Sequence, residues 1–348
     1  MGLLFKLMVL LRVGLGLAIS IEMYDFLDHQ ASLAQIAYCI NGKGGLRRGP
    51  DSELIFPSQL DTSVDANETL GEQRRYTLET IIDPGSGYVL VDHLCCTIHL
   101  VFRGSKTQDD WLSDASFLPS KFEPIVLKES AWKEVWGYPL ASAAVGLMSP
   151  SQALAKWSEV FEEGFWVHTG FFATVERILP VVLGAVVKAQ VNNHGYTVEV
   201  TGHSMGGAVA LLCAIEFDLV GMQVGVTTFS APRTFSPKLA RFVDSRFVHR
   251  RVVHGGDIVP YVPPRPIYGH SGTEMYVAKK GLPHAASDVA VRGGGGEAQN
   301  AEAQDADNED ELVESTGIGE QLLHRIKKAL GSAEHSNLLR QLSQCARL

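Results

Sequence analysis

The stretch that decides the fold is TVEVTGHSMGGAVALLCAIEF, residues 197–217. Its first part, TVEVT, alternates β-branched residues and predicts a strand. Its last part, from Ala208 to Phe217, is almost continuously apolar and predicts a buried helix. Between them lies a glycine-rich turn, residues 202–207, that holds the pattern G-x-S-x-G. A strand that ends at a serine and turns at once into a helix is typical of a nucleophile elbow.

Ser204 lies at the bend of this turn and is the predicted nucleophile. The glycines leave room where side chains would collide with the neighbouring strand and helix. Ser204 also precedes a helix N-terminus, where the helix dipole favours developing negative charge. The backbone N–H of Met205 is the first predicted oxyanion donor. A chance match in a glycine-rich turn is the alternative, and the flanking strand and helix argue against it.

The nucleophile needs an acid and a base, expected in the chain order serine, acid, histidine. Asp257 in HGGDIVPYVPP follows a predicted strand, FVHRRVVH at 247–254. In a parallel sheet this end of the strand lies at the edge where the serine turn also opens. Asp218 and Asp244 are alternatives, but they fall in or near predicted helices.

Four histidines follow the predicted acid: His270, His284, His324 and His335. His335 is the preferred base, because it opens the final helix and lies ten residues before Cys345. If Cys345 is tethered to Cys39, His335 is held in place. His324 lies on a lysine-rich helical face that is expected to be solvated. His270 and His284 stay open as alternatives.

A second oxyanion donor is expected after the strand TIHLVF, residues 97–102. That strand ends at Arg103-Gly104-Ser105, where Gly104 gives room and Ser105 offers a backbone N–H and a hydroxyl. Each donor of this kind is typically worth roughly 10²–10³ in rate. The alternative is an ordinary turn that ends a strand.

Strands alternate with helices along the whole chain, which indicates an α/β fold with a mostly parallel sheet covered on both faces. Helices are predicted at 26–39 and 171–190, and a further strand at 225–232. Residues 319–348 are helical in pattern. The length of 348 residues suits one large domain or two small ones.

The formal net charge of −9 comes mainly from residues 297–314, which hold many acidic residues and no Lys or Arg. With the four glycines before it, this run predicts a disordered acidic insertion at about 286–316. The rest of the chain has no basic stripe, so nucleic acid is not an expected partner. No His/Cys cluster has zinc spacing, so neither a metal nor another cofactor is expected.

The first twenty residues, MGLLFKLMVLLRVGLGLAIS, are apolar and end in a small-x-small cleavage pattern. They predict a signal peptide, and hence a secreted protein. Lys6 and Arg12 interrupt the apolar stretch. The alternatives are therefore an uncleaved membrane anchor, residence in the endomembrane lumen, or an ordinary first helix.

Several separated motifs resemble the fungal-type class 3 lipase family. They are LVFRGSKTQDDWLSD (100–114), VHTGFF (167–172), VTGHSMGGAVA (200–210), TFSAPR (228–233), GDIVPYVPP (256–264) and AEHSNLL (333–339). The resemblance runs from about residue 30 to 280 and again from about 330 to the end.

This resemblance implies an α/β-hydrolase fold with a mostly parallel central sheet, helices on both faces and a lid insertion. It places a single domain at 21–348 and the lid at about 115–165, longer than the family's usual lid. The residue roles that it implies are a catalytic triad of Ser204, Asp257 and His335, an oxyanion hole of Ser105 and Met205, support of the oxyanion loop by Asp114, and a disulfide between Cys39 and Cys345. Glu334 departs from the family, which usually has Asp before the histidine.

The predicted function is a triacylglycerol lipase, a serine esterase that cleaves fatty-acyl esters through an acyl-enzyme on Ser204. Its partner would be a lipid or ester substrate at a lipid–water interface, with no obligate protein partner. An esterase or phospholipase of the same family is the alternative enzyme. A non-catalytic lipase-like scaffold is the alternative from another class of protein.

Overall fold

The computed structural model describes most of the chain that bears the predicted motifs. The described residues are 18–40, 47–48, 54–55, 76–82, 86–105, 118–128, 146–161, 164–293, 328 and 332–342.

An eight-stranded sheet forms the centre of the molecule, in the order β12-β11-β10-β9-β8-β5-β4-β3. Its strands are β3 (Tyr76–Ile82), β4 (Gly87–Asp92), β5 (Thr97–Phe102), β8 (Thr197–His203), β9 (Val224–Phe229), β10 (Val248–His254), β11 (Thr273–Val277) and β12 (Val289–Arg292). From β5 to β11 neighbouring strands are parallel, whereas β3, β4 and β12 pair antiparallel at the edges. The predicted mostly parallel sheet is confirmed.

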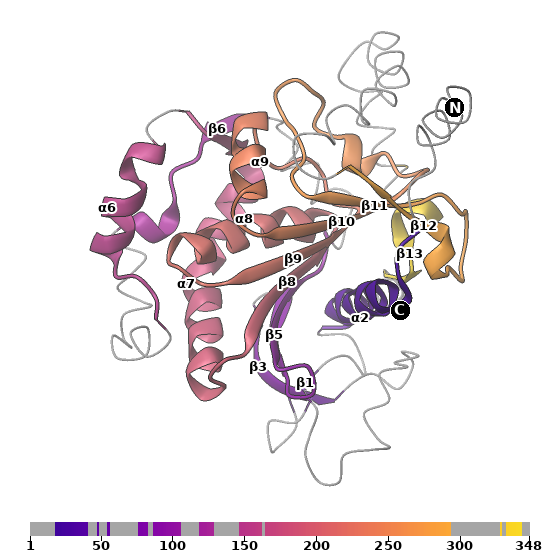
Figure 1. Ribbon diagram of the computed structural model, residues 1–348, viewed down its shortest axis with the longest axis horizontal. Helices are drawn as coiled ribbons and strands as arrows, with labels where there is room; N and C mark the ends of the chain where they lie inside the picture. Colours follow the sequence, from indigo (N-terminus) through magenta and orange to yellow (C-terminus); the bar gives the residue numbers. More distant parts are fainter. Residues whose placement is uncertain are drawn as a thin grey trace, which may run out of the picture.

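Helices cover both faces of this sheet, as predicted. Figure 1 shows α2 on one side and α7 with α8 on the other. The helices are α2 (Ile21–Ala37), α6 (Pro150–Phe161), α7 (Thr169–Asn192), α8 (Met205–Leu219), α9 (Pro237–Asp244) and α12 (Ala333–Ser336), with single 3₁₀ turns η1 (Ile125–Leu127), η2 (Val259–Tyr261) and η3 (Ala286–Asp288). Short strand pairs form from β1 (Arg47–Arg48) with β2 (Leu54–Ile55), β6 (Pro119–Lys121) with β7 (Trp166–His168), and β13 (Asn337–Leu338) with β14 (Arg340–Gln341).

The local elements next to the serine turn follow the sequence closely. The strand predicted at 97–102 is β5, and the strand and helix that flank Ser204 are β8 and α8. The helix predicted at 26–39 begins earlier, at Ile21, because the Ser20 side chain caps it by accepting a hydrogen bond from the Met23 N–H at 3.2 Å.

The helical prediction for residues 319–348 agrees with the structure at Lys328 and in α12, and is wrong for residues 337–342. Only α12 is helical within 332–342, and the β13–β14 hairpin follows it directly. The hairpin turns at Leu339, whose φ of 57° lies in the left-handed region. The spacing of Leu338 and Leu342 fits a helix. In the structure, however, both side chains are buried at the hairpin, in the apolar cluster that it shares with the sheet.

Residues just before α2 already belong to the folded domain. Ala18 forms an isolated bridge with Ala290, and the Ile19 N–H donates to the Val289 carbonyl at 3.3 Å. Ile19 is also buried in the same apolar cluster as Val289. Residues 1–17 lie outside the described part of the chain, so a signal peptide at 1–20 stays a prediction.

The acidic insertion starts later than composition indicates. Residues 286–292 form η3 and β12, and β12 pairs with β11 from Val289 to Arg292. The expectation of disorder from residue 286 is therefore wrong, because Val289 and Val291 pack in the core. Residues 294–316 lie outside the described residues.

Part of the expected lid region, 115–165, belongs to the core. Phe122 and Val126 are buried in the main apolar cluster, where the Phe122 ring contacts that of Phe172 in α7. Trp157 of α6 is buried too, with its Nε1–H donating to the Leu219 carbonyl at 2.9 Å. Residues 115–117, 129–145 and 162–163 of this region lie outside the described residues.

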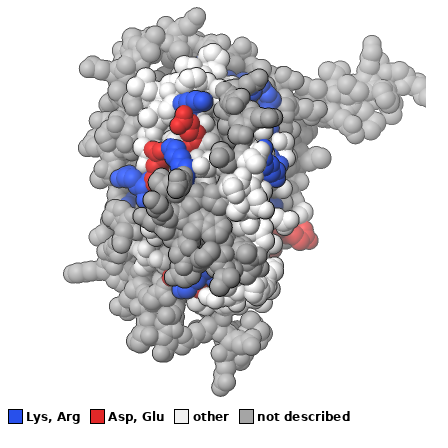
Figure 2. All heavy atoms as spheres, turned by 90° about the vertical axis from the view of Figure 1, so that its left-hand side faces the viewer, with Lys and Arg blue, Asp and Glu red and all other residues white. Residues whose placement is uncertain are grey.

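The helix α7 is long and apolar enough to cross a membrane by length and composition alone. In this fold it packs with one face against the sheet and α8, where Val175, Leu179 and Val186 are buried. On the face shown in Figure 2, basic and acidic side chains lie beside one another among the described residues. Among the ion pairs of the described residues, Lys128, which follows η1, pairs with Glu176 of α7 at 3.0 Å.

We predict that Trp157→Phe destabilises the protein by about 1–3 kcal/mol, because the buried Leu219 carbonyl loses its donor. A denaturant midpoint at unchanged m-value measures the loss. Trp166→Phe is the matched control, since Trp166 is 44% exposed, and it should change stability by less than about 0.5 kcal/mol. Equal midpoints for Trp157→Phe and the wild type would show that α6 is a mobile flap rather than core.

Candidate active site

Ser204 stands at the junction of β8 and α8 in a backbone conformation that side chains rarely adopt. Its φ is 56° and its ψ is −131°, and its N–H donates to the Phe229 carbonyl at 2.8 Å. A Cβ at Gly202 would lie 2.1 Å from the Gly206 carbonyl oxygen, and one at Gly206 would lie 2.4 Å from that of Arg103. Both positions therefore require glycine, and strained backbone of this kind is typical of functional turns.

The structure brings three of the predicted site residues into one hydrogen-bonded line. The Ser204 Oγ lies 3.0 Å from His335 Nε2, and His335 Nδ1 lies 2.8 Å from Asp257 Oδ2. The three side chains are at most 3% exposed. Asp257 follows β10 at the edge where β8 ends, and His335 comes from α12, whose first turn is capped by Ser332.

The carboxylate at the end of this line is held in its ionised form. Burial alone would raise the pKa of Asp257, but the His335 imidazole and the Val259 N–H, which donates to Oδ1 at 3.0 Å, outweigh it. The pKa therefore lies below its ordinary value. An ionised carboxylate at this place orients the Nδ1–H of His335 and stabilises a positive charge on its ring.

The alternative acids have other partners. Asp218 forms an ion pair with Arg246 at 2.7 Å. Asp244 accepts a hydrogen bond from the Gly272 N–H at 2.6 Å.

The alternative histidines are likewise placed elsewhere. His270 is directed at the Pro260 carbonyl, with Nε2 and O 2.5 Å apart, and burial holds its pKa well below the usual value. His284 bonds the Lys279 carbonyl and the Leu339 N–H. His324 lies outside the described residues.

The predicted oxyanion residues lie next to each other. Ser105 follows β5, and its Oγ donates to the Met205 sulfur at 3.3 Å. Met205 opens α8, so its N–H has no acceptor within the helix. A Cβ at Gly104 would lie 2.9 Å from the Ser204 Cβ, which shows how closely this loop packs on the serine. Asp114 lies outside the described residues.

A second hydrogen-bonded chain runs behind the serine, and sequence reasoning missed it. The Gly104 N–H donates to the Tyr38 Oη at 2.9 Å, and that hydroxyl donates to His203 Nδ1 at 2.5 Å. His203 Nε2–H then donates to the backbone carbonyl of His335 at 2.9 Å. The loop at Gly104, the serine turn and the His335 segment are thereby tied together through α2.

His203 is neutral in this chain. Burial and the neighbouring His335 lower its pKa to about 3. In the sequence, the one signal for this hydrogen-bonded chain is the histidine directly before Ser204. Tyr38 carries no such signal, because it follows α2 and lies far from the motif in the sequence.

One group of described residues has side chains of the types that hold a metal. His29, Asp92 and His99 place donor atoms within 4.8 Å of one another, and His29 Nε2 lies 3.7 Å from Asp92 Oδ2. Asp92 pairs with the first residue of β5, whereas Ser204 follows the last residue of the parallel strand β8. This group therefore lies toward the opposite edge of the sheet and is separate from the serine site.

The predicted disulfide is described on one side only. Cys39 is buried, with its sulfur 3.7 Å from the Gln35 carbonyl. Cys345 lies outside the described residues, so the Cys39–Cys345 bridge stays a prediction.

Comparisons with known proteins agree on one family. The family model described as "Lipase (class 3)" matches residues 99–266. "Putative lipase LIH1" of Saccharomyces cerevisiae is 32% identical over 265 residues, which cover 70% of each chain. "Secreted mono- and diacylglycerol lipase 2" of Gibberella zeae is 26% identical over 78% of this chain and 66% of its own.

A solved structure has the same fold. The Lip2 lipase of Yarrowia lipolytica superposes with a TM-score of 0.61 at 22% identity, covering 94% of this chain and 96% of its own.

We predict that Tyr38→Phe lowers the free energy of unfolding by about 1–3 kcal/mol, because the buried Gly104 N–H and His203 Nδ1 lose their shared partner. Chemical denaturation measures the change. Tyr196→Phe is the control, since its hydroxyl bonds His93 in a less buried setting at 3.3 Å. A Tyr38→Phe protein as stable as the control would contradict the hydrogen-bonded chain.

Proposed function

Because the chain belongs to the class 3 lipase family, we propose that it is a triacylglycerol lipase that cleaves fatty-acyl esters through an acyl-enzyme on Ser204. Membership of this family makes it a hydrolase of carboxylic esters. The observation that carries the catalytic assignment is the line from the Ser204 hydroxyl through His335 to Asp257, with distances of 3.0 and 2.8 Å.

In the proposed mechanism, Nε2 of His335 takes the proton of the Ser204 hydroxyl while Oγ attacks the ester carbonyl carbon. Asp257 keeps the other ring proton on Nδ1 and stabilises the imidazolium that forms. The tetrahedral intermediate expels the alcohol, which takes the proton from Nε2, and leaves the acyl group on Oγ. Water then attacks the acyl-enzyme with His335 again as base, and the fatty acid departs.

The negative oxygen of the intermediate needs donors at a fixed place. We assign this role to the backbone N–H groups of Met205 and Ser105, with the Ser105 hydroxyl as a third donor. In the resting enzyme this hydroxyl points at the Met205 sulfur, a weak acceptor. It can therefore turn to a developing oxyanion at little cost.

The substrate class rests on the relatives and on the site together. The relative from Gibberella zeae is named a mono- and diacylglycerol lipase, and the yeast relative is named a lipase. An esterase or phospholipase of the same family is the second candidate. A non-catalytic scaffold is disfavoured, because it has no need of a buried serine, histidine and ionised carboxylate in line.

We also propose that the protein is secreted and that Cys39 and Cys345 join its two ends. The apolar first segment supports secretion, and so does the Gibberella zeae relative, which is named as secreted. An oxidising compartment would allow the bridge.

Ser204→Ala should lower the rate of p-nitrophenyl ester hydrolysis by about 10⁴-fold or more, since the nucleophile is lost. Ser151→Ala changes an exposed serine of α6 and serves as the control with unchanged rate. Thermal unfolding of both variants checks the fold. Equal rates for Ser204→Ala and the wild type would sink the proposed mechanism.

We expect the rate on tributyrin to jump once the substrate exceeds its solubility limit and forms an interface. A titrimetric assay across that limit measures it, with dissolved p-nitrophenyl acetate as the reference ester. Saturation below the limit with no jump identifies an esterase instead. A faster rate on phosphatidylcholine vesicles than on tributyrin identifies a phospholipase.

A further inference from the structure

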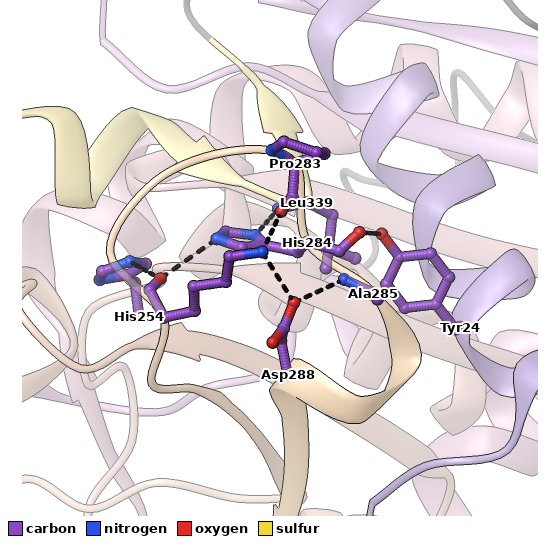
Figure 3. Close-up of polar contacts among 8 residues, drawn as sticks. Tyr24, His254, Pro283, His284, Ala285, Asp288 and Leu339 are labelled. Atoms are coloured by element: carbon purple, nitrogen blue, oxygen red, sulfur yellow. Dashed lines mark hydrogen bonds and ion pairs between the residues drawn. The ribbon is translucent and has the colours of Figure 1, made fainter.

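Two histidines outside the proposed triad share one acceptor. The Nε2 atoms of His254 and His284 lie 2.9 and 3.1 Å from the same carbonyl oxygen, that of Lys279 (Figure 3). The two residues come from different parts of the chain, the end of β10 and the loop before η3. Their shared acceptor joins these parts on the side of the sheet that carries the His335 segment.

The two histidines and the Lys279 carbonyl form a bridge, which on one side reaches the loop that carries the proposed acid. His254 ends β10, and its Nδ1 accepts from the Gly256 N–H at 3.2 Å. The His254 carbonyl accepts from the Asp257 N–H at 3.0 Å. His254 therefore shapes the turn that presents Asp257.

On the other side, the bridge reaches the hairpin that carries the proposed base. Nδ1 of His284 accepts from the Leu339 N–H at 3.3 Å. Leu339 is the left-handed turn residue of the hairpin that follows His335 in the chain. The hairpin is closed onto α12 by the Leu342 N–H, which donates to the Ser336 carbonyl at 2.8 Å.

The partners fix the protonation of both rings. In each ring Nδ1 accepts from a backbone N–H, so it bears no proton, and Nε2 faces a carbonyl, so it bears one. The His284 ring is therefore neutral, and each of the two rings connects a donor on one side to an acceptor on the other.

The loop from Lys279 to Asp288 is held by contacts that do not involve either ring. The Lys279 ammonium donates to the Pro283 carbonyl at 2.6 Å and pairs with Asp288 at 3.3 Å. Asp288 also accepts from the Ala285 N–H at 2.8 Å. From the other face, the Tyr24 hydroxyl of α2 donates to the His284 carbonyl at 2.6 Å (Figure 3).

We propose that His284 is a positioning residue for the proposed hydrolytic reaction: its neutral ring holds the Leu339 turn, and with it His335, in register with the Asp257 loop. The inference rests on the proposed function, because it assigns His335 the role of base. It makes alignment of the base depend on His284 remaining uncharged.

Charge on His284 would break this link. Protonation of Nδ1 would set two donors, that proton and the Leu339 N–H, against each other. The groups that face the ring are His254 from β10, Tyr24 from α2, Lys279 from its own loop and Asp288 from η3. Burial, opposed by the bond to the Lys279 carbonyl, lowers the pKa of His284 below its usual value.

The sign of the pH effect follows from this direction. A histidine whose folded-state pKa is lowered is neutral at pH 7, and the link is complete above the unfolded value of about 6.5. The link is lost as the pH falls through the lowered folded-state pKa. Activity should then fall on the acid side as the His284 ring becomes protonated.

The test compares two variants of the full chain. His284→Leu keeps the size of the side chain but has no acceptor, whereas the amide oxygen of His284→Asn can accept from the Leu339 N–H and does not titrate. We expect kcat on p-nitrophenyl butyrate to fall about 10- to 100-fold in His284→Leu with KM nearly unchanged, as for a misplaced catalytic group. His284→Asn should recover most of this loss.

The pH profile and the Leu339 amide separate positioning from mere stability. The acid limb of kcat should be less steep in His284→Asn than in the wild type, because the asparagine side chain does not titrate. Hydrogen exchange at the Leu339 amide should be faster in His284→Leu and close to wild type in His284→Asn. His194→Asn, on an exposed turn, is the control with unchanged values.

Different results overturn the two proposals. If Ser204→Ala is inactive but His284→Leu keeps kcat within about twofold of wild type, only the positioning role is wrong. If Ser204→Ala is active, the proposed function fails, whereas Leu339 exchange still reports on the His284 link. Should His284→Leu not fold, an unaltered acid limb in His284→Asn contradicts the proposal.

Discussion

The contacts around the site all serve one hydrogen bond, that between Ser204 and His335. It joins residues 131 positions apart, one on a strained turn inside the sheet and one in a four-residue helix beyond it. A helix of four residues needs contacts with other segments to stay in position. The chain through Tyr38 and His203 holds the His335 backbone from behind, and the bridge through His284 holds the hairpin that follows it.

The hydrogen-bond partners of the buried histidines determine which ring can accept a proton from the serine. The Nε2–H groups of His203, His254 and His284 each donate a hydrogen bond to a backbone carbonyl. A carbonyl does not compensate a full positive charge in a buried place. His335 carries its proton on Nδ1 and faces the ionised carboxylate of Asp257, which does compensate it. Among these rings, only His335 combines a free Nε2 lone pair for the serine with a partner for its charge.

This selection explains what could and could not be predicted from the sequence. Ser204 and Asp257 follow strands within a few residues, so local pattern was enough to find them and the parallel sheet around them. The choice of His335 over His284 depends on which loop reaches the carboxylate, and contact across the fold decides that. Tyr38 leaves no local trace, because it acts through its hydroxyl at the end of a helix. At the Leu339 hairpin the sequence predicts a helix, because the spacing of its apolar residues fits either structure.

The start of the described chain is coupled to this same support. Ile19 donates to the carbonyl of Val289, the residue after Asp288, and packs in the apolar cluster that also contains Leu338, Leu339 and Leu342. Ser20 caps α2, the helix that supplies Tyr24 to the His284 loop. Cleavage directly after Ser20 would remove the strand-edge contact and the cap together, and would loosen the hairpin behind His335. Residues 18–20 therefore belong to the support of the hairpin behind His335.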